Sequence, residues 1–223
     1  MNTLGIDAAD FAGHYPRLYH MAQDGAWDSI RCHGLLSTSA LLDLYQVDGD
    51  LRRQIESCHR PKSREIAHPE HGTAVIRDQQ PMSDSGLLKC LCGMTPRDWY
   101  ELLNRKVFFW VREERVRQLL DAMMYRNSAH TVITLETASM LRVHQDNITL
   151  SPINSGSTLY NPRPRGADTF LPLHEYPFDD RKKKAGLARA VAELAVDYSV
   201  PDVLEHVTRV ERRKGGLVLE KLL

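Results

Sequence analysis

Residues 18–37 read LYHMAQDGAWDSIRCHGLLS, and this stretch predicts a strand, a turn and a helix in succession. Residues 18–22 are short, mostly apolar and preceded by Pro16, a pattern typical of a buried strand. Asp24-Gly25 is a turn pair. The apolar residues that follow share one helical face: Trp27, Ile30, Leu35 and Leu36. They predict a short helix that ends at Gly34.

Short strands and helices continue in mixed order along the rest of the chain. Further strands are expected at residues 107–111 (VFFWV), 130–135 (HTVITL), 148–152, 191–196 and 208–211. Helices are expected at 39–45, from Thr95-Pro96 onward, at 116–123 and at 201–207, with a helix or loop at 184–189. Long loops are expected at 68–86, around a short extended piece at 74–76, and at the Pro-rich stretch 160–180. Because regular βαβ alternation is missing, we expect an α+β fold in which one domain spans residues 1–223, with central mixed or antiparallel sheets and flanking helices.

The composition excludes several classes of protein. The 223 residues include 29 Lys+Arg and 29 Asp+Glu, with 42% hydrophobic and 26% charged residues. These values exclude a disordered, collagenous or disulfide-scaffold protein. A net charge of zero also argues against a protein that coats nucleic acid by bulk charge. Any contact with phosphate must therefore come from local clusters of basic residues.

The cysteines and the N-terminus indicate the compartment. Four cysteines, with Cys90 and Cys92 only two positions apart, form no disulfide framework, and one C-x-C lacks the second ligand pair of a structural zinc site. Histidines near Cys58 do not complete a ligand set, so we expect no metal. The N-terminus MNTLGIDAADF has no apolar core of a signal peptide, and residues 107–111 are far too short to span a membrane. We expect a cytoplasmic protein without a membrane partner.

Three polar positions interrupt segments that otherwise look buried or structural. The first is His20 beside Tyr19, although a lone strand histidine is more often a core residue than a catalytic one. The second is Arg77, which with Asp78 more often forms a surface ion pair. The third is Glu193, a single carboxylate in an apolar strand, where acids are rare unless they are paired or functional. Glu193 is the strongest catalytic candidate among the acids.

Residues 18–37 resemble the opening of ADP-ribosyltransferase-type folds, in which a strand with Y-H-x-(T/A) precedes a helix with S-I-x-x-x-G-L-L. The order of the later segments is most similar to DarT-like DNA ADP-ribosyltransferases. Residues 106–111 (KVFFWV), with the helix to Tyr125, resemble their V-P-F-Y-F…M-L-Y segment. Residues 192–210 (AELAVDYSVPDVLEHVTRV) resemble their closing segment, which carries a glutamate. The resemblance spans most of the chain, is loose between segments, and implies a single-domain ADP-ribosyltransferase-like fold.

This resemblance also implies roles for the candidate residues. Breaking an N-glycosidic bond creates an oxocarbenium-like sugar, which needs a nearby carboxylate and a fixed ribose. Glu193 would be that carboxylate, His20 would bind the ribose, and Arg77 would lie near phosphate and the reacting centre. Tyr19 is carried over as a substrate-binding neighbour of His20. Two further residues, Tyr125 and Arg126, would stack against a base or nicotinamide.

Two loops supply further substrate-binding candidates. In residues 151–156, Asn154 would contact a flipped base. In residues 163–170, Asp168 would do the same or act as a second acid, and Arg165 joins it as a binding residue. Turn chemistry explains the Asn, Asp, Ser and Gly content of these loops equally well.

Basic residues gather in two stretches, although a charge run is usually a solvated face. Residues 52–64 hold five basic residues against one acidic residue, and residues 161–189 hold seven against four. Two such stretches around a glycosidic site would fit a groove that follows a nucleic-acid backbone. We therefore expect DNA as the partner, single-stranded or with a flipped base.

We expect ADP-ribosyl transfer from NAD to a DNA base, in a toxin or antiphage-defence setting that the resemblance alone implies. The alternative is a DNA glycosylase that needs no NAD and leaves an abasic site. Two further alternatives are an inactive ligand-binding member of the fold and an enzyme similar to RNA 2′-phosphotransferases. The latter needs several phosphate-binding arginines, which the sequence does not place.

Overall fold

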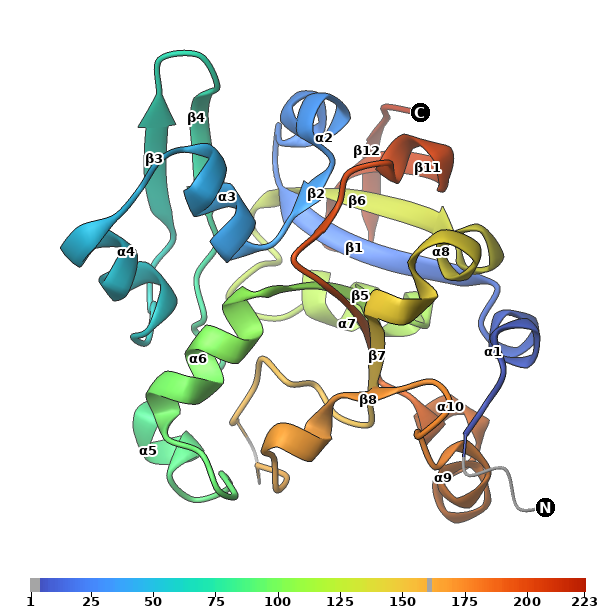
Figure 1. The fold of residues 1–223 in the computed structure, drawn as a ribbon. Helices are drawn as coiled ribbons and strands as arrows, with labels where there is room; N and C mark the ends of the chain where they lie inside the picture. The colour runs from blue at the N-terminus through green and yellow to red at the C-terminus, as the bar shows by residue number, and fades with distance from the viewer. Residues whose placement is uncertain (1–4, 160–161) are drawn as a thin grey trace.

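The computed structural model describes residues 5–159 and 162–223 (Figure 1). The helices are α1 (Ala8–His14), α2 (Trp27–His33), α3 (Thr38–Leu44), α4 (Gly49–Glu56), α5 (Asp84–Leu87), α6 (Pro96–Asn104), α7 (Glu113–Leu120), α8 (Thr137–His144), α9 (Phe178–Ala185) and α10 (Leu187–Ala190), with 3-10 turns η1 (Gln145–Asn147), η2 (Ala167–Thr169) and η3 (Val203–Glu205). The strands are β1 (Arg17–Gln23), β2 (Leu35–Leu36), β3 (Arg64–His68), β4 (Gly72–Ile76), β5 (Lys106–Trp110), β6 (Ala129–Glu136), β7 (Ile148–Ser151), β8 (Leu171–Pro172), β9 (Glu193–Asp197), β10 (Ser199–Val200), β11 (Val207–Lys214) and β12 (Leu217–Lys221).

An eight-stranded antiparallel sheet in the order β12-β11-β6-β1-β5-β9-β7-β8 organises the fold. Strand β1 pairs with β6 along its whole length, from Arg17 opposite Glu136 to Gln23 opposite His130. Its described pairing with β5 on the other side is confined to one position, Tyr19 opposite Trp110. The sheet therefore consists of two four-stranded halves that part beyond this pair, and β7 is steeply inclined to β1 in Figure 1.

Apolar side chains cover both faces of this sheet. The largest core cluster packs Leu18 of β1 and Phe109 of β5 against α1 and α8. On the opposite face, Met21 of β1 packs against Val116 and Leu120 of α7. This alternation along β1 follows the period of two of a strand, so neighbouring residues such as His20 and Met21 face opposite sides.

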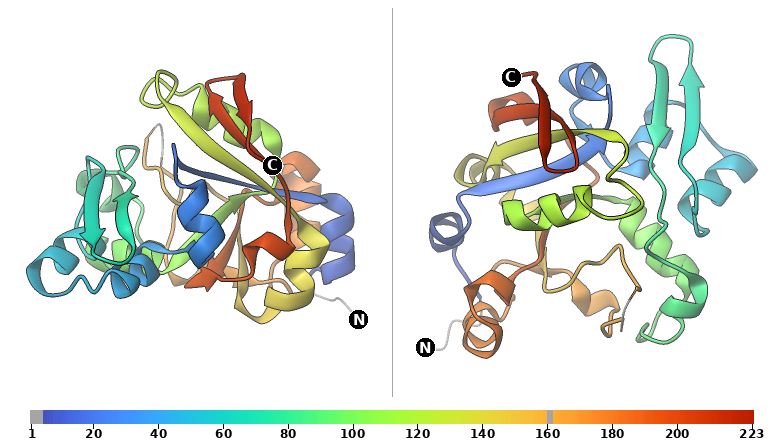
Figure 2. Two further views of the ribbon diagram at one scale, coloured as in Figure 1. Left: turned by 90° about the horizontal axis from the view of Figure 1, so that it is seen from above. Right: turned by 180° about the vertical axis from the view of Figure 1, so that it is seen from behind.

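A smaller unit stands beside the sheet, formed by α3, α4 and the β3–β4 hairpin (Figures 1 and 2). Leu42, Ile55 and Ile66 form its core with Ile76. Helix α6 connects this unit to β5. It begins as the sequence predicts, with a capping box between Thr95 and Asp98 and Pro96 in the first turn.

The α+β class is confirmed, and most expected elements lie where their patterns placed them. Several local predictions are wrong. Leu35 and Leu36 do not continue the α2 face but form β2, which pairs with β10. Residues 64–68 form β3, so the expected 68–86 loop begins inside a hairpin. The sequence patterns also do not predict helices α1, α4, α5 and α8, strands β8, β10 and β12, or the start of α9. The expected helix at 201–207 is a 3-10 turn, η3.

Two of the predicted segments include residues that the structure does not describe. Residues 1–4 of the N-terminal stretch and residues 160–161 of the Pro-rich stretch lie outside the described residues. Within the described part of the chain, no helix is long and apolar enough to cross a membrane.

Gly34 fixes the junction between α2 and β2. Its φ is +79°, and a Cβ atom there would lie 2.5 Å from the backbone of Val200 and Pro201. Gly186 has a similar φ of +77°, but a Cβ atom there would meet open space. A left-handed conformation costs an L-residue roughly 1–2 kcal/mol. At Gly34 the backbone collision is added to this cost.

We predict that Gly34→Ala lowers the free energy of unfolding by at least about 2 kcal/mol more than Gly186→Ala, because only the first substitution collides with the β10 segment. Urea unfolding of the two variants measures this difference. Equal losses would mean that β2 and β10 separate freely at this junction.

Candidate active site

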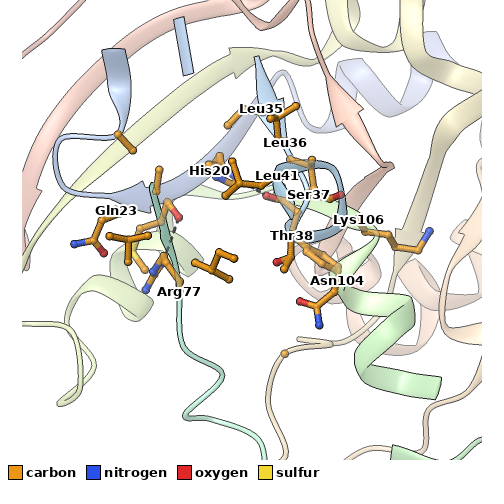
Figure 3. Close-up of a pocket in the computed structure, with 18 of the residues that line it drawn as sticks. His20, Gln23, Leu35, Leu36, Ser37, Thr38, Leu41, Arg77, Asn104 and Lys106 are labelled. Carbon is orange, nitrogen blue, oxygen red and sulfur yellow. Dashed lines mark hydrogen bonds between the residues drawn. The ribbon is translucent and has the colours of Figure 1, made fainter. Parts of the chain in front are cut away.

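A cavity of about 480 Å³ lies beside the parting of β1 and β5. Figure 3 shows its walls: His20 and Gln23 on β1, Arg77 after β4, Ser37 and Thr38 at the start of α3. Asn154 and Glu193 line the same cavity from the other half of the molecule. Its volume falls within the range of small-molecule sites, roughly 300–1,000 Å³.

His20 bridges the two halves of the sheet. Its Nδ1 lies 2.8 Å from the carbonyl oxygen of Phe108 on β5. A carbonyl only accepts, so Nδ1–H donates, and Nε2 carries the lone pair. Burial lowers the pKa of His20 to about 4, the Arg77 charge adds to this effect, and the Phe108 bond opposes it. At neutral pH, His20 is therefore a neutral hydrogen-bond acceptor at the cavity wall, suited to a hydroxyl group.

Arg77 follows β4 directly and lies on the same side of the cavity as His20 and Gln23 (Figure 3). Its guanidinium donates to the carbonyl oxygen of Met21 at 3.2 Å and lies 4.9 Å from the centre of the Tyr125 ring. Burial lowers the pKa of Arg77. No described carboxylate lies within 4.0 Å of it. Arg77 is half-buried, its near partners are the Met21 backbone carbonyl and the Tyr125 ring, and the Asp78 charge acts on it from farther away. A guanidinium without an ion pair at the cavity wall favours an anionic ligand.

Arg60, which the sequence grouped with a basic surface stretch, is instead buried at the cavity wall. It donates to the carbonyl oxygens of Arg77 at 2.7 Å and Ile55 at 2.5 Å, and to the Asn104 side chain at 3.3 Å. Burial lowers its pKa to about 10. These bonds fix the backbone that carries Arg77. Arg60 is therefore a positioning residue, and no periodicity in the sequence marks it.

Glu193, the first residue of β9, is 4% exposed and lines the cavity. Its Oε2 accepts a hydrogen bond from the Ser155 backbone N–H at 3.1 Å. Burial raises the pKa of Glu193 to about 7, while Ser155 and the positive charges of Arg115 and Arg165 oppose the rise. The carboxyl group can therefore be neutral or ionised near pH 7, as general acid–base and electrostatic roles require.

The loop after β7 carries Ser155 toward Glu193. Arg165 holds this loop from behind: its guanidinium donates to the Ser155 carbonyl oxygen at 3.0 Å and lies 5.7 Å from the Trp99 ring centre. Asn154 lines the cavity, and its side chain accepts from the Gly156 backbone N–H at 3.2 Å. The structure thus places Arg165 as a support for the Glu193 loop, and Asn154 as a wall residue that also makes the turn.

The predicted site residues divide into two groups. His20, Arg77, Tyr125, Asn154 and Glu193 all line the cavity. The other four, Tyr19, Arg126, Arg165 and Asp168, do not line it, so the structure does not bring them together with the first group. Tyr19 packs on the α7 face because it alternates with His20 along β1. Arg126 and Asp168 are exposed, in a turn and in η2, and neither lines the cavity.

The two basic stretches do not form one groove. In the first, Arg52 pairs with Glu56 at 2.7 Å, Arg53 pairs with Asp50, and Arg60 is buried, which leaves Lys62 and Arg64 exposed. Four of the seven basic residues of the second stretch lie on α9, at the opposite end of the molecule from α4 (Figures 1 and 2). Much of the local positive excess is therefore neutralised or buried.

Comparison with known proteins gives one match. Residues 16–207 match the model of a protein family described as Family of unknown function (DUF7002). No curated protein and no solved structure matches the chain.

Titration of Glu193 and titration of His20 change the free energy of unfolding in opposite directions as the pH rises. Glu193 has a folded pKa near 7 against an ordinary value of 4.5, so the free energy of unfolding falls as the pH rises through this window. His20 has a folded pKa near 4 against 6.5, so the free energy of unfolding falls as the pH drops through that window. Between pH 4.5 and 6.5 the two effects oppose each other.

We predict that Glu193→Gln, which mimics the neutral acid, raises the free energy of unfolding at pH 8 by an amount of the order of 3 kcal/mol, with little change near pH 4.5. Chemical unfolding across this range measures the effect. His20→Asn is the matched control and must flatten the loss between pH 6.5 and 4 instead. Parallel pH profiles for the wild type and both variants would contradict the burial of these groups.

Proposed function

The chain belongs to the DUF7002 family, and we propose that it is an enzyme that cleaves the N-glycosidic bond of NAD and transfers the ADP-ribosyl group to a base of DNA. One observation carries this proposal: a hydrogen-bond acceptor for a hydroxyl group, a guanidinium and a buried carboxyl group line the same cavity, on His20, Arg77 and Glu193. An ADP-ribosyltransferase-like fold belongs to the same proposal, and it rests on the resemblance of residues 18–37, 106–111 and 192–210.

Ribose and phosphate recognition falls to the wall formed by β1 and β4. The Nε2 lone pair of His20 accepts a hydrogen bond from a ribose hydroxyl, and the Phe108 carbonyl holds the ring in this tautomer. Arg77 supplies the positive charge for the pyrophosphate, and its bond to Met21 keeps the guanidinium against β1. Both groups are oriented before the ligand binds, which reduces the entropy that binding costs.

Glu193 acts at the anomeric carbon. The bond from ribose C1′ to the nicotinamide nitrogen breaks, and its electron pair neutralises the nicotinamide ring. The ionised carboxylate stabilises the oxocarbenium-like sugar, and a base nitrogen then forms the new bond at C1′ while its proton passes to the Glu193 carboxylate. The positive nicotinamide ring itself favours the ionised form of a carboxyl group whose pKa lies near 7.

DNA as the acceptor comes from the resemblance to DarT-like enzymes rather than from the surface charge. Exposed Lys62 and Arg64 on the hairpin side are the basic residues of the first stretch that stay free to contact a backbone. The acceptor base must leave its stack to reach a buried carbon, so single-stranded DNA is the preferred substrate. Binding is expected to weaken steeply with salt.

We predict that the purified chain adds one ADP-ribosyl group to single-stranded oligonucleotides only when NAD is present, as measured by mass spectrometry of the DNA. Oligonucleotides containing a single kind of base identify the acceptor. Abasic sites formed without NAD would overturn transfer and establish base excision instead. ADP-ribosylation of RNA but not of DNA would contradict DNA as the acceptor.

We further predict that Glu193→Gln lowers the transfer rate by roughly 10²–10³-fold while leaving the NAD dissociation constant within a few-fold, because the carboxylate acts on developing charge. Arg77→Met should instead weaken NAD binding by about 10–100-fold through the loss of charged hydrogen bonds. Arg126→Ala and Asp168→Asn, both outside the cavity, are the controls and should change neither quantity. Full activity of the Glu193 variant would exclude its assigned role.

A further inference from the structure

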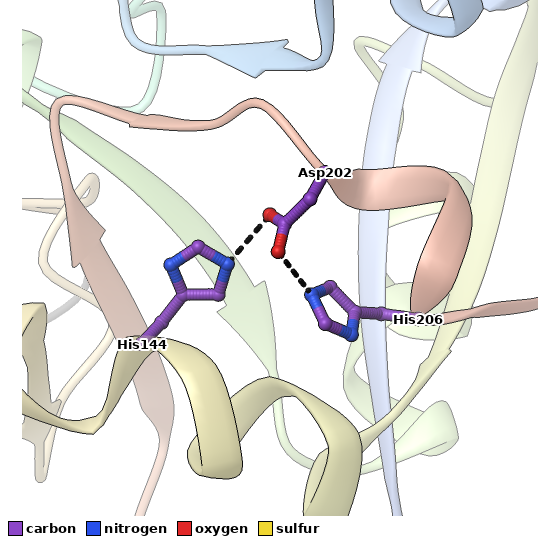
Figure 4. A group of neighbouring side chains, drawn as sticks. All are labelled: His144, Asp202 and His206. Carbon is purple, nitrogen blue, oxygen red and sulfur yellow. Dashed lines mark hydrogen bonds and ion pairs between the residues drawn. The ribbon is translucent and has the colours of Figure 1, made fainter.

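Three side chains with metal-binding chemistry converge away from the cavity. His144 is the last residue of α8, and Asp202 and His206 flank η3 (Figure 4). One ligand atom from each residue lies within 4.8 Å of the other two. His144 and His206 are buried, and the Asp202 side chain is 22% exposed.

Both imidazoles present the same nitrogen to the same carboxylate. His144 Nε2 lies 2.7 Å from Asp202 Oδ1, and His206 Nε2 lies 3.2 Å from Asp202 Oδ2 (Figure 4). The rings are nearly perpendicular, at 80°. If both nitrogens carry protons, they donate hydrogen bonds to the shared carboxylate. If both carry lone pairs, the two nitrogens and the carboxylate form a set of metal ligands.

The outer partner of His206 is Ser139, whose Oγ lies 2.6 Å from His206 Nδ1. The hydroxyl oxygen can accept a hydrogen bond from Nδ1–H, and in that tautomer of neutral His206 the Nε2 lone pair faces the carboxylate. A metal cation between Nε2 and the carboxylate would be bound by both. Metal-bound histidines characteristically donate their second N–H in this way.

We propose that His144, Asp202 and His206 bind a divalent first-row transition metal, with Zn²⁺ as the best fit. Two imidazole nitrogens and one carboxylate are suitable zinc ligands, and three protein ligands leave a fourth position for water on the exposed side of Asp202. Tetrahedral zinc at about 2.0–2.1 Å from each ligand requires ligand atoms about 3.4 Å apart. The three ligand atoms lie within 4.8 Å of one another, so metal binding would have to bring them to that spacing.

The site would brace one wall of the cavity. Asp202 lies two residues after β10, and β10 pairs with β2, whose residues Leu35 and Leu36 line the cavity. Metal binding would fix the turn after β10 against α8 and so hold β2 in place. The sequence predicts no metal here because His144 is far in sequence from Asp202 and His206, which are four residues apart.

The test uses the full chain, stripped with a chelator and then dialysed against buffered Zn²⁺. We expect about one zinc ion per chain by elemental analysis and a melting temperature raised by a few degrees. Asp202→Asn and His206→Gln should each weaken zinc binding at least tenfold. Cobalt substitution should give the visible absorption bands of a four-coordinate site.

The control is His174→Gln, which removes an exposed histidine that also lies beside a carboxylate, Glu175. This variant must bind zinc as the wild type does. Circular dichroism of the metal-free variants shows whether they fold, and Asp202→Glu should restore binding if carboxylate ligation is the cause of the loss. Zinc affinity that is unchanged in the folded Asp202 and His206 variants, or no saturable binding by the wild type, would overturn the site.

Discussion

The structure depends on where β1 stops pairing with β5. In an antiparallel sheet each backbone group between neighbouring strands needs a partner, and beyond Tyr19 and Trp110 the described ladder between these strands ends. Side chains replace it: His20 donates to the Phe108 carbonyl, and Arg77 donates to the Met21 carbonyl. The same two bonds that complete the separated strand edges also place an acceptor and a cation on the cavity wall. The side chains that complete the hydrogen bonding of the parted strands are therefore the same ones to which the proposal assigns ligand binding.

Burial then determines the charges in the cavity. It keeps His20 neutral, raises the pKa of Glu193 toward 7 and lowers the pKa of Arg77. A chain with equal numbers of basic and acidic residues therefore has a site that is positive on one wall and titratable on the other. Elsewhere many basic side chains are neutralised locally, as Arg52 is by Glu56. The net charge of zero is a sum over the whole chain and does not predict the charges of the residues that line the cavity.

The sequence predicts six of the eight strands of the main sheet, all but β8 and β12, because apolar, β-branched runs bounded by turn residues are local signals. It also identifies Glu193, since an acid in an apolar strand stands out within a few residues. The sequence does not predict features that depend on residues far away along the chain. Arg60 belongs to a basic stretch of the sequence, but in the structure it donates hydrogen bonds to Asn104 and to the Arg77 carbonyl oxygen. Tyr19 was chosen as a neighbour of His20, yet alternation along β1 sends it to the other face. The β2–β10 pair and the β3 strand are likewise fixed by contacts that no short window contains.

The most direct test of the central claim is nitrogen NMR of the His20 ring in the full chain, with and without NAD. The account predicts a neutral ring protonated at Nδ1 across pH 5–8, because its pKa lies near 4, and a shift of the Nε2 resonance when NAD binds. Substitution of His20 assigns the signal. A ring that titrates near its ordinary pKa of 6.5, with an Nε2 resonance indifferent to saturating NAD, would contradict the account.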